Sequence, residues 1–173
     1  DLYAGVEFNP VPTELAVTLT SLSKPFAHFA NLGSDEYAIS CKINTKKGSE
    51  RIVRAAFEFA KQHGRKKVTI VHKANVVRAT DGLFLEEAKK VARDFPEIQV
   101  DDANIDAICM WLLKNPFAYD VLVAPNLYGD IISDLCAGLV GGLGLVPGSN
   151  IGTDCAVFEA VHGTAPDIAG KGL

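Results

Sequence analysis

The stretch Lys67-Val-Thr-Ile-Val-His72 decides the fold class, because it is an apolar run of strand length that opens a regular alternation of strands and helices. Further runs of strand character lie at Glu97-Ile-Gln-Val100, Asp120-Val-Leu-Val-Ala124 and Ala156-Val-Phe-Glu-Ala160. The segments between them have helical patterning: residues 81–95 end before Pro96, residues 102–114 end before Pro116, and a glycine-rich helix follows Ala124. This alternation predicts an α/β sheet covered by helices on its faces.

The residues before this stretch divide into a helix and an arm. Ser49–His63 is expected to form a helix, with Ser49 as the N-cap and Gly64 as the C-terminal stop. Residues 11–47 have weak periodicity, with expected strands at Ala16–Thr20 and Tyr37–Ile43. A turn-rich stretch separates these strands, so the sequence predicts a β arm that stands apart from the main body.

Composition excludes several classes of function. The chain has 173 residues, 48% hydrophobic and 22% charged, with a net charge of -4, which gives no reason to expect nucleic acid or an anionic membrane as a partner. No apolar run approaches the roughly 20 residues of a membrane helix. The four cysteines are scattered without CxxC spacing, which favours free thiols in a reducing compartment. Because the chain lacks an initial Met and stops after a glycine-rich loop, we expect an internal piece of a larger protein.

Two carboxylates stand out in the segment from Asn126 to Gly144, which is otherwise mainly apolar or glycine. Asp130 and Asp134 are four residues apart, so on a helix they share one face. No Lys or Arg lies between Val121 and Ala169 to neutralise them. A hard divalent cation such as Mg²⁺ or Mn²⁺ would suit this pair. The alternative is that they are solvated helix acids, with Asp130 helping to cap the N-terminus.

Other candidates have equally open alternatives. Lys73 follows the strand that ends at His72, at the edge where α/β sheets bind ligands, but it could be a solvated strand-end lysine. Asp106 suits the dipole of its helix and becomes a metal ligand only if it faces the Asp130–Asp134 pair. Tyr3 could be a proton donor or an aromatic anchor. The loop Val161–Ile168 could pass close to a ribose or phosphate, although it is not a GxGxxG fingerprint.

Several motifs occur together in the order of one family. They are Asp1-Leu-Tyr-Ala-Gly-Val-Glu7, Val71-His-Lys-Ala-Asn75, Asp81-Gly-Leu-Phe84, Asn126-Leu-Tyr-Gly-Asp-Ile-Ile-Ser-Asp134, Gly148-Ser-Asn-Ile-Gly152 and Phe158-Glu-Ala-Val-His-Gly-Thr-Ala-Pro-Asp-Ile-Ala-Gly170. Through them the chain resembles the β-decarboxylating dehydrogenases, the family of isocitrate and isopropylmalate dehydrogenases. The resemblance is strong over residues 1–7 and 49–173 and poor over 11–47, where the variable clasp of the family falls.

The resemblance implies an α/β fold with a small domain of mixed sheet and helices, a protruding β clasp and an incomplete large domain. Residues 1–10 would be a strand segment that enters the small domain, and residues 11–47 the clasp-like arm. Residues 48–150 would form the small domain, which carries dimerisation and metal binding. Residues 151–173 would begin the cofactor loop of the large domain.

The resemblance also implies roles for single residues. Asp130 and Asp134 match the metal-binding acids, and Asp106 matches a third acid that the partner subunit supplies. Lys73, also from the partner, matches the lysine that assists deprotonation of the substrate hydroxyl, and Tyr3 matches the tyrosine that protonates the enolate. The remaining matches are Asn75, a substrate-side residue near that lysine, and the cofactor-binding residues His162, Gly163, Thr164, Ala165, Asp167 and Ile168.

The implied activity is oxidative decarboxylation of isocitrate to 2-oxoglutarate with NAD and Mg²⁺ or Mn²⁺. Asp167-Ile168 stand where NADP-preferring relatives carry Lys-Tyr, and an acid there favours a free ribose hydroxyl, hence NAD. Homoisocitrate or isopropylmalate dehydrogenase, and a non-catalytic regulatory subunit, are the alternatives. We expect a homodimer with a shared site, no nucleic-acid or membrane partner, and a cytoplasmic location or the mitochondrial matrix in a eukaryote. We expect the chain alone to fold and dimerise without turning over substrate.

Overall fold

The computed structural model describes residues 5–172, and its body is built on a parallel sheet of three strands. The strand β3 (Lys67–His72) lies in the middle, between β4 (Gln99–Asn104) and β5 (Val121–Val123). Lys67 pairs with Gln99 on one side, and Val68 pairs with Val121 on the other. The predicted α/β sheet is therefore confirmed, with β3 as its central strand.

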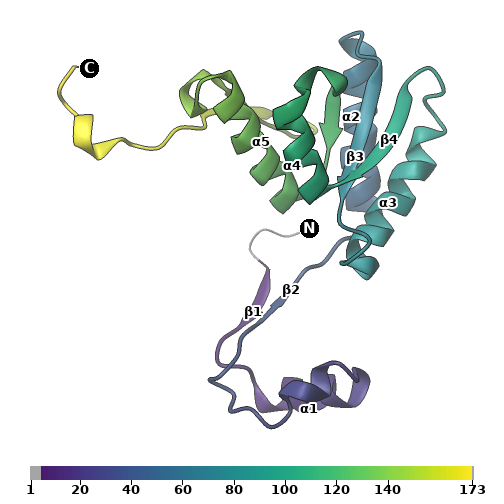
Figure 1. Cartoon of the computed structure of the whole chain (residues 1–173), viewed down its shortest axis with the longest axis vertical. Coiled ribbons are helices and arrows are strands. Elements are labelled where there is room, and N and C mark those ends of the chain that lie inside the picture. Colours follow the sequence, from purple (N-terminus) through teal and green to yellow (C-terminus); the bar gives the residue numbers. More distant parts are fainter. Residues whose placement is uncertain (1–4, 173) are drawn as a thin grey trace.

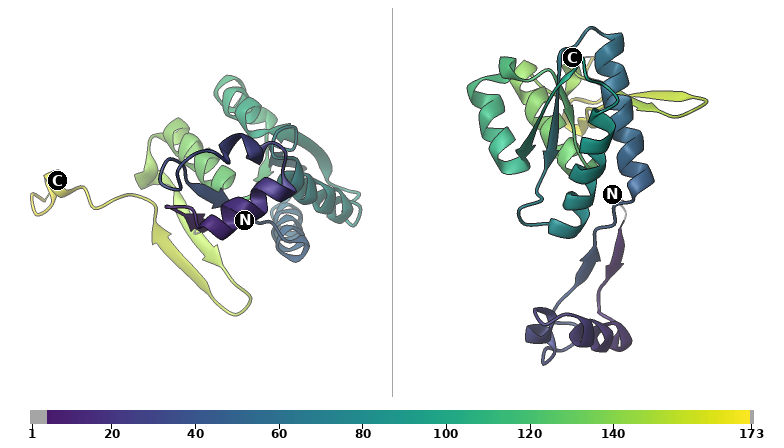
Figure 2. Two further views of the ribbon diagram at one scale, coloured as in Figure 1. Left: turned by 90° about the horizontal axis from the view of Figure 1, so that it is seen from below. Right: turned by 90° about the vertical axis from the view of Figure 1, so that its right-hand side faces the viewer.

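Helices cover both faces of this sheet (Figure 2). Val68 and Ile70 of β3 pack with α2 (Lys46–Gln62) and α3 (Arg78–Ala92) in one buried cluster. Val71 points the other way and packs with Ile108 and Leu112 of α4 (Ile105–Lys114) and Ile132 of α5 (Asn126–Val140). Because side chains alternate along a strand, one apolar run supplies both layers of core.

The start of α2 differs from the expectation. The helix begins at Lys46 with Thr45 as its N-cap, whose hydroxyl oxygen accepts the backbone N–H of Gly48 at 3.1 Å. Ser49 is buried inside the helix and is not the cap. The expected C-terminal stop is confirmed, since Gly64 has a φ of 65°, a left-handed conformation that favours glycine.

The next two helices also begin at other residues than expected. The helix α3 starts at Arg78, so Asp81 lies inside its first turn. The helix α4 starts at Ile105, because residues up to Asn104 continue β4 as a strand that pairs along the whole of β3. A short 3-10 turn, η2 (Pro116–Ala118), then leads into β5.

The arm projects from the body and carries helical structure at its outer end (Figure 1). Its stem is an antiparallel pair of β1 (Val6–Phe8) and β2 (Ile39–Cys41), and its outer end holds α1 (Thr13–Leu22) and the 3-10 turn η1 (Phe26–Phe29). The expected strand at Ala16–Thr20 is wrong. The hydroxyls of Thr18 and Thr20 each donate to the carbonyl four residues earlier, at 2.8 Å, which satisfies these β-branched side chains within a helix.

The chain after α5 leaves the body as an extended segment (Figure 1). A 3-10 turn, η3 (Leu143–Leu145), precedes a hairpin of β6 (Pro147–Ile151) and β7 (Ala156–Ala160), and η4 (Pro166–Ile168) lies near the end. A strand at Ala156–Ala160 was expected within the α/β alternation, but β7 pairs with β6 in a separate antiparallel hairpin, and β6 was not expected. The strand β6 contains the expected domain boundary between residues 150 and 151. The proposed division of the chain into domains stays a prediction.

Parallel and antiparallel pairing thus occur in separate sheets. Within the described residues, no helix combines the length and the apolar character that crossing a membrane requires.

Candidate functional site

The candidate site lies at the edge of the sheet where the strands end. Since β3 and β5 are parallel, their carboxyl ends meet at the same edge. Lys73 follows the last residue of β3, and α5 begins with Asn126 shortly after β5 ends at Val123. This edge is the usual place for ligands in α/β sheets.

Lys73 is an ion-paired residue at this edge. Its ammonium nitrogen forms a short salt bridge with Oδ1 of Asp106, in the first turn of α4. The side chain of Lys73 is 22% exposed and that of Asp106 is 67% exposed. The bond from Lys73, aided by backbone N–H groups of Asp106 and Ala107, holds the pKa of Asp106 below its ordinary value. Lys73 is thus a paired strand-end lysine, and its catalytic role stays a prediction.

The backbone around Lys73 is held by side chains on two sides. Its own N–H donates to Oδ2 of Asp81 at 2.7 Å, and the N–H of Ala74 donates to Nδ1 of His72 at 3.0 Å. This second bond requires Nδ1 without a proton, so Nε2 carries the proton toward Asp102, 3.1 Å away. Asn75 lies on the same turn and is exposed. The turn that presents Lys73 and Asn75 is thus ordered by two buried side chains.

Asp81 was not predicted as a site residue, although its motif was noticed. It is fully buried, and its Oδ1 accepts from the ammonium of Lys42 at 2.5 Å. Tyr128 of α5 also bonds to Asp81, and burial together with this bond raises the pKa of the tyrosine. The sequence signal that could have found Asp81 is an acid at the start of an apolar helix, where burial requires a countercharge.

Asp130 and Asp134 lie one turn apart on α5, and both are exposed. Pro125 occupies the N-cap position of α5, so the reading of Asp130 as a capping residue is wrong. No group of three His, Cys, Asp or Glu residues suited to hold a metal occurs within residues 5–172. The acids of α5 are two hard oxygen donors, which fit Mg²⁺ or Mn²⁺ as part of a site, while Asp106 in the same chain is engaged with Lys73.

The predicted cofactor loop lies on the extended segment after the hairpin, away from β3 and α4 (Figure 1). All of its residues from His162 to Ile168 are exposed, and Ala165 has a φ of 44°. The Nδ1 of His162 bonds to the carbonyl of Gly163 at 2.9 Å. Tyr3 lies outside the described residues.

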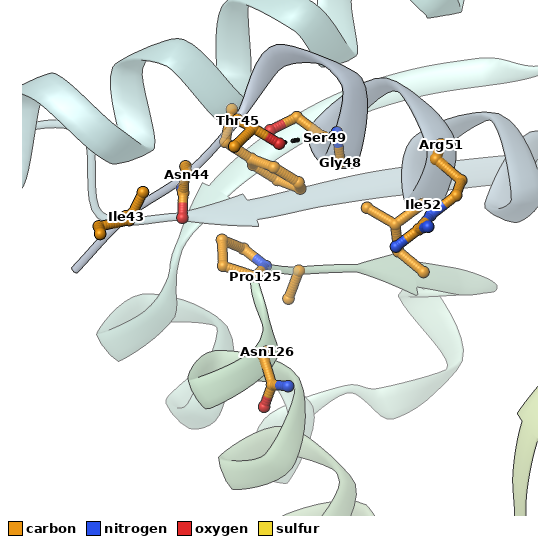
Figure 3. A pocket seen from close by; sticks show the side chains of 11 residues that line it. Ile43, Asn44, Thr45, Gly48, Ser49, Arg51, Ile52, Pro125 and Asn126 are labelled. Carbon is orange, nitrogen blue, oxygen red and sulfur yellow. Dashed lines mark hydrogen bonds between the residues drawn. The ribbon is translucent and has the colours of Figure 1, made fainter. Parts of the chain in front are cut away.

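A pocket of about 440 Å³ opens beside the start of α5 (Figure 3). Its wall consists of the chain that leaves the arm (Ile43 to Thr45), the first turns of α2, Phe84 of α3, and the junction from Ala124 to Asn126. None of the predicted catalytic, metal-binding or cofactor residues lines it. The pocket therefore adjoins the candidate site without being its centre.

The fold and the site residues define a class of α/β chain, with a lysine at the carboxyl edge of a parallel sheet and an acid pair on the helix that follows the neighbouring strand. The family model described as isocitrate/isopropylmalate dehydrogenase matches residues 3–173. The chain belongs to the isocitrate/isopropylmalate dehydrogenase family.

Individual relatives agree with this assignment. The chain is 58% identical to a probable isocitrate dehydrogenase (NAD) subunit alpha, mitochondrial, of Drosophila melanogaster. The 134 aligned residues cover 78% of this chain and 36% of that protein. The chain is 55% identical over 141 residues to the 3-isopropylmalate dehydrogenase of Archaeoglobus fulgidus, covering 82% and 43%. The crystal structure of isocitrate dehydrogenase from Methylococcus capsulatus superposes with a TM-score of 0.82 at 48% identity, covering 99% of this chain and 45% of that one. The chain thus spans less than half the length of each of these three relatives.

Proposed function

We propose that this chain is the part of an NAD-dependent isocitrate dehydrogenase that carries its catalytic lysine and its metal-binding acids. The proposed reaction is oxidative decarboxylation of isocitrate to 2-oxoglutarate. The observation that carries the proposal is the pairing of Lys73 with Asp106 at the sheet edge from which α5, with Asp130 and Asp134, departs.

The cofactors would supply the electronic chemistry: NAD as the hydride acceptor, and Mg²⁺ or Mn²⁺ as the electrophile that stabilises negative charge on substrate oxygens. Asp130 and Asp134 would hold the metal with Asp106. In the reaction, C2 of isocitrate loses a hydride and its hydroxyl loses a proton. The resulting β-keto acid then loses CO₂, and the enol or enolate takes up a proton from Tyr3.

Lys73 would take part in the loss of the hydroxyl proton. The ammonium of Lys73 is paired with Asp106 of the same chain. A turn of Asp106 toward a bound metal would leave the lysine nitrogen free to face the substrate hydroxyl. A role for Asp106 in metal binding and a role for Lys73 as a base are compatible for this reason.

A second copy of the chain would complete the site. Asp106 is paired with Lys73 in its own chain, and no three-residue metal group occurs among the described residues. These observations support a division in which one subunit supplies Lys73, Asn75 and Asp106, and its partner supplies Asp130 and Asp134. Such a site requires a dimer, and the proposed partner is an identical chain.

The proposed cofactor is NAD, bound by the loop from His162 to Ile168. Asp167 is an acid in this loop, and a carboxylate accepts a ribose 2′-hydroxyl but repels a 2′-phosphate. The alternative substrates are homoisocitrate and isopropylmalate. For isopropylmalate the support is a relative named 3-isopropylmalate dehydrogenase, which matches at 55% identity beside the isocitrate relative at 58%. The regulatory-subunit alternative is disfavoured because Lys73, Asp106, Asp130 and Asp134 are all present.

A calorimetric titration with Mn²⁺ tests the proposal. We expect saturable binding that is lost in D134N, because Asp134 belongs to the pair that would hold the metal. In D106N binding should be weakened, because Asp106 would be a further ligand supplied by the second copy. D154N is the matched control, since Asp154 is an exposed acid in the turn between β6 and β7, and it should bind as the unchanged chain does. Equal heats for D134N and D154N would contradict the metal site.

A further inference from the structure

Asp81 is the only fully buried carboxylate among residues 5–172. Burial of an unpaired charge is costly, so such a group needs both a countercharge and hydrogen-bond donors. Both of its oxygens are used: Oδ1 accepts from Lys42 at 2.5 Å and Oδ2 accepts from the backbone N–H of Lys73 at 2.7 Å. Asp81 therefore joins the end of the arm directly to the residue proposed as the catalytic lysine.

The connection to the arm has further contacts. Lys42 follows β2, and its ammonium lies 4.2 Å from the centre of the Tyr128 ring, a cation–π contact. Asn44, two residues later, donates to the carbonyl of Thr80 at 3.0 Å. The arm is thus tied to the first turn of α3 at two neighbouring points, beside the helix that carries Asp130 and Asp134.

We propose that Asp81 is a positioning residue for Lys73, and that Lys42 couples the position of the arm to it. This inference rests on the proposed function of Lys73. The reach of a lysine side chain depends on where its backbone stands, and small displacements of reacting groups cost large factors in rate. Lys73 is held at its backbone by Asp81 and at its ammonium by Asp106, so both ends of the residue are fixed.

The simpler role for Asp81 is structural, since an acid in the first turn of α3 is favoured by the helix dipole. A structural role predicts that loss of the ion pair loosens the whole domain evenly. A positioning role predicts that the Lys73 backbone loosens before the rest of the sheet. The two roles therefore differ in the order of local opening.

Amide hydrogen exchange followed by NMR separates the two roles. The readout is the exchange rate of the Lys73 amide divided by that of Ile70, in the middle of β3. In K42M, which leaves Asp81 without its countercharge, we expect this ratio to rise by about tenfold or more. K42R restores the charge and should bring the ratio back to within about twofold of the unchanged chain.

K67M is the matched control. Lys67 pairs with Asp101 at 2.6 Å at the other end of β3, and its side chain is as exposed as that of Lys42, at 25% against 24%. We expect the ratio to stay unchanged in K67M. D81N should act as K42M does, and K42M with K42R still decides the question if D81N does not fold.

Two results would overturn the inference: an unchanged ratio in K42M, or an equal rise in K67M. This measurement is independent of the Mn²⁺ titration. An unchanged ratio with intact Mn²⁺ binding rejects only the positioning role. Absence of saturable Mn²⁺ binding by the unchanged chain, together with the expected ratio, rejects the proposed function and leaves Asp81 as the group that holds the Lys73 backbone without a catalytic purpose.

Discussion

The α/β body and the arm differ in where their apolar side chains lie. The body buries its apolar residues in two clusters, one on each face of the sheet. The arm has one fully buried apolar residue among those described, Val11, and its helix α1 has none. Val17 and Leu22 of α1 are 65% and 78% exposed.

This difference separates two sources of stability. Burial of apolar surface is the main favourable contribution to folding, so the body carries most of the free energy of unfolding. The arm is held by short strand pairing, by a local cluster of Phe26, Phe29 and Tyr37, and by Lys42. Its exposed apolar side chains agree with the dimer proposed above, in which a second copy would cover them.

The largest expected effect comes from a matched pair of phenylalanine substitutions. Phe57 is fully buried in the body and stacks on Phe95, with ring centroids 5.1 Å apart, whereas Phe29 in the arm is 46% exposed. F57A should lower the free energy of unfolding by about 3–5 kcal/mol, and F29A by about 1 kcal/mol. Urea denaturation followed by Trp111 fluorescence measures both. Equal losses would break the comparison of body and arm.

A smaller effect is expected where the arm passes into the body, at the start of α2. Thr45 caps this helix, so T45A should lower stability by about 1 kcal/mol, and T45S, which keeps the hydroxyl, should restore most of it. S49A tests the cap that the sequence pattern favoured, and a change below about 0.5 kcal/mol is expected because its hydroxyl caps nothing. A greater loss in S49A than in T45A, by the same denaturation measurement, would contradict the observed helix start.

The smallest expected effect is a pH dependence of thermal stability that comes from Asp120, an exposed carboxylate of the body. The backbone N–H of Lys66 donates to Asp120 at 2.6 Å, and this bond, with the N–H of Lys67 and the charge of Arg65, lowers the pKa of Asp120. A lowered pKa in the folded state stabilises the fold above the unfolded pKa of about 4, and this stabilisation is lost as the pH falls through the folded value. The midpoint of thermal unfolding should therefore be higher in the unchanged chain than in D120N at pH 7. This difference should shrink toward pH 3, and a constant difference would contradict the prediction.

The parts that the sequence predicted well are those where one pattern dominates. The apolar run of β3, the left-handed stop at Gly64 and the two acids on one helix face follow from side-chain periodicity and backbone sterics, which act locally. The resemblance in motifs also agreed with the family assignment.

The misassigned elements have identifiable physical causes. In Ala16–Thr20, apolar and β-branched residues alternate as in a strand, but their hydroxyls bond within a helix. Thr45 and Ser49 are both good caps, but the helix starts at Lys46 and the hydroxyl of Thr45 accepts the N–H of Gly48, which leaves Ser49 inside the helix. The strand β6 needs β7 as its partner, a contact that its own composition does not indicate.

By itself, the sequence determined the alternating α/β order, the family and the candidate residues at the carboxyl edge of the sheet, because these depend on periodicity and on motifs along the chain. Tertiary structure alone decided that Lys73 pairs with Asp106 and that Asp81 is buried between Lys42 and the backbone of Lys73. Those contacts join residues up to 39 positions apart. The charge and burial of such residues become linked only when the sheet brings their segments together.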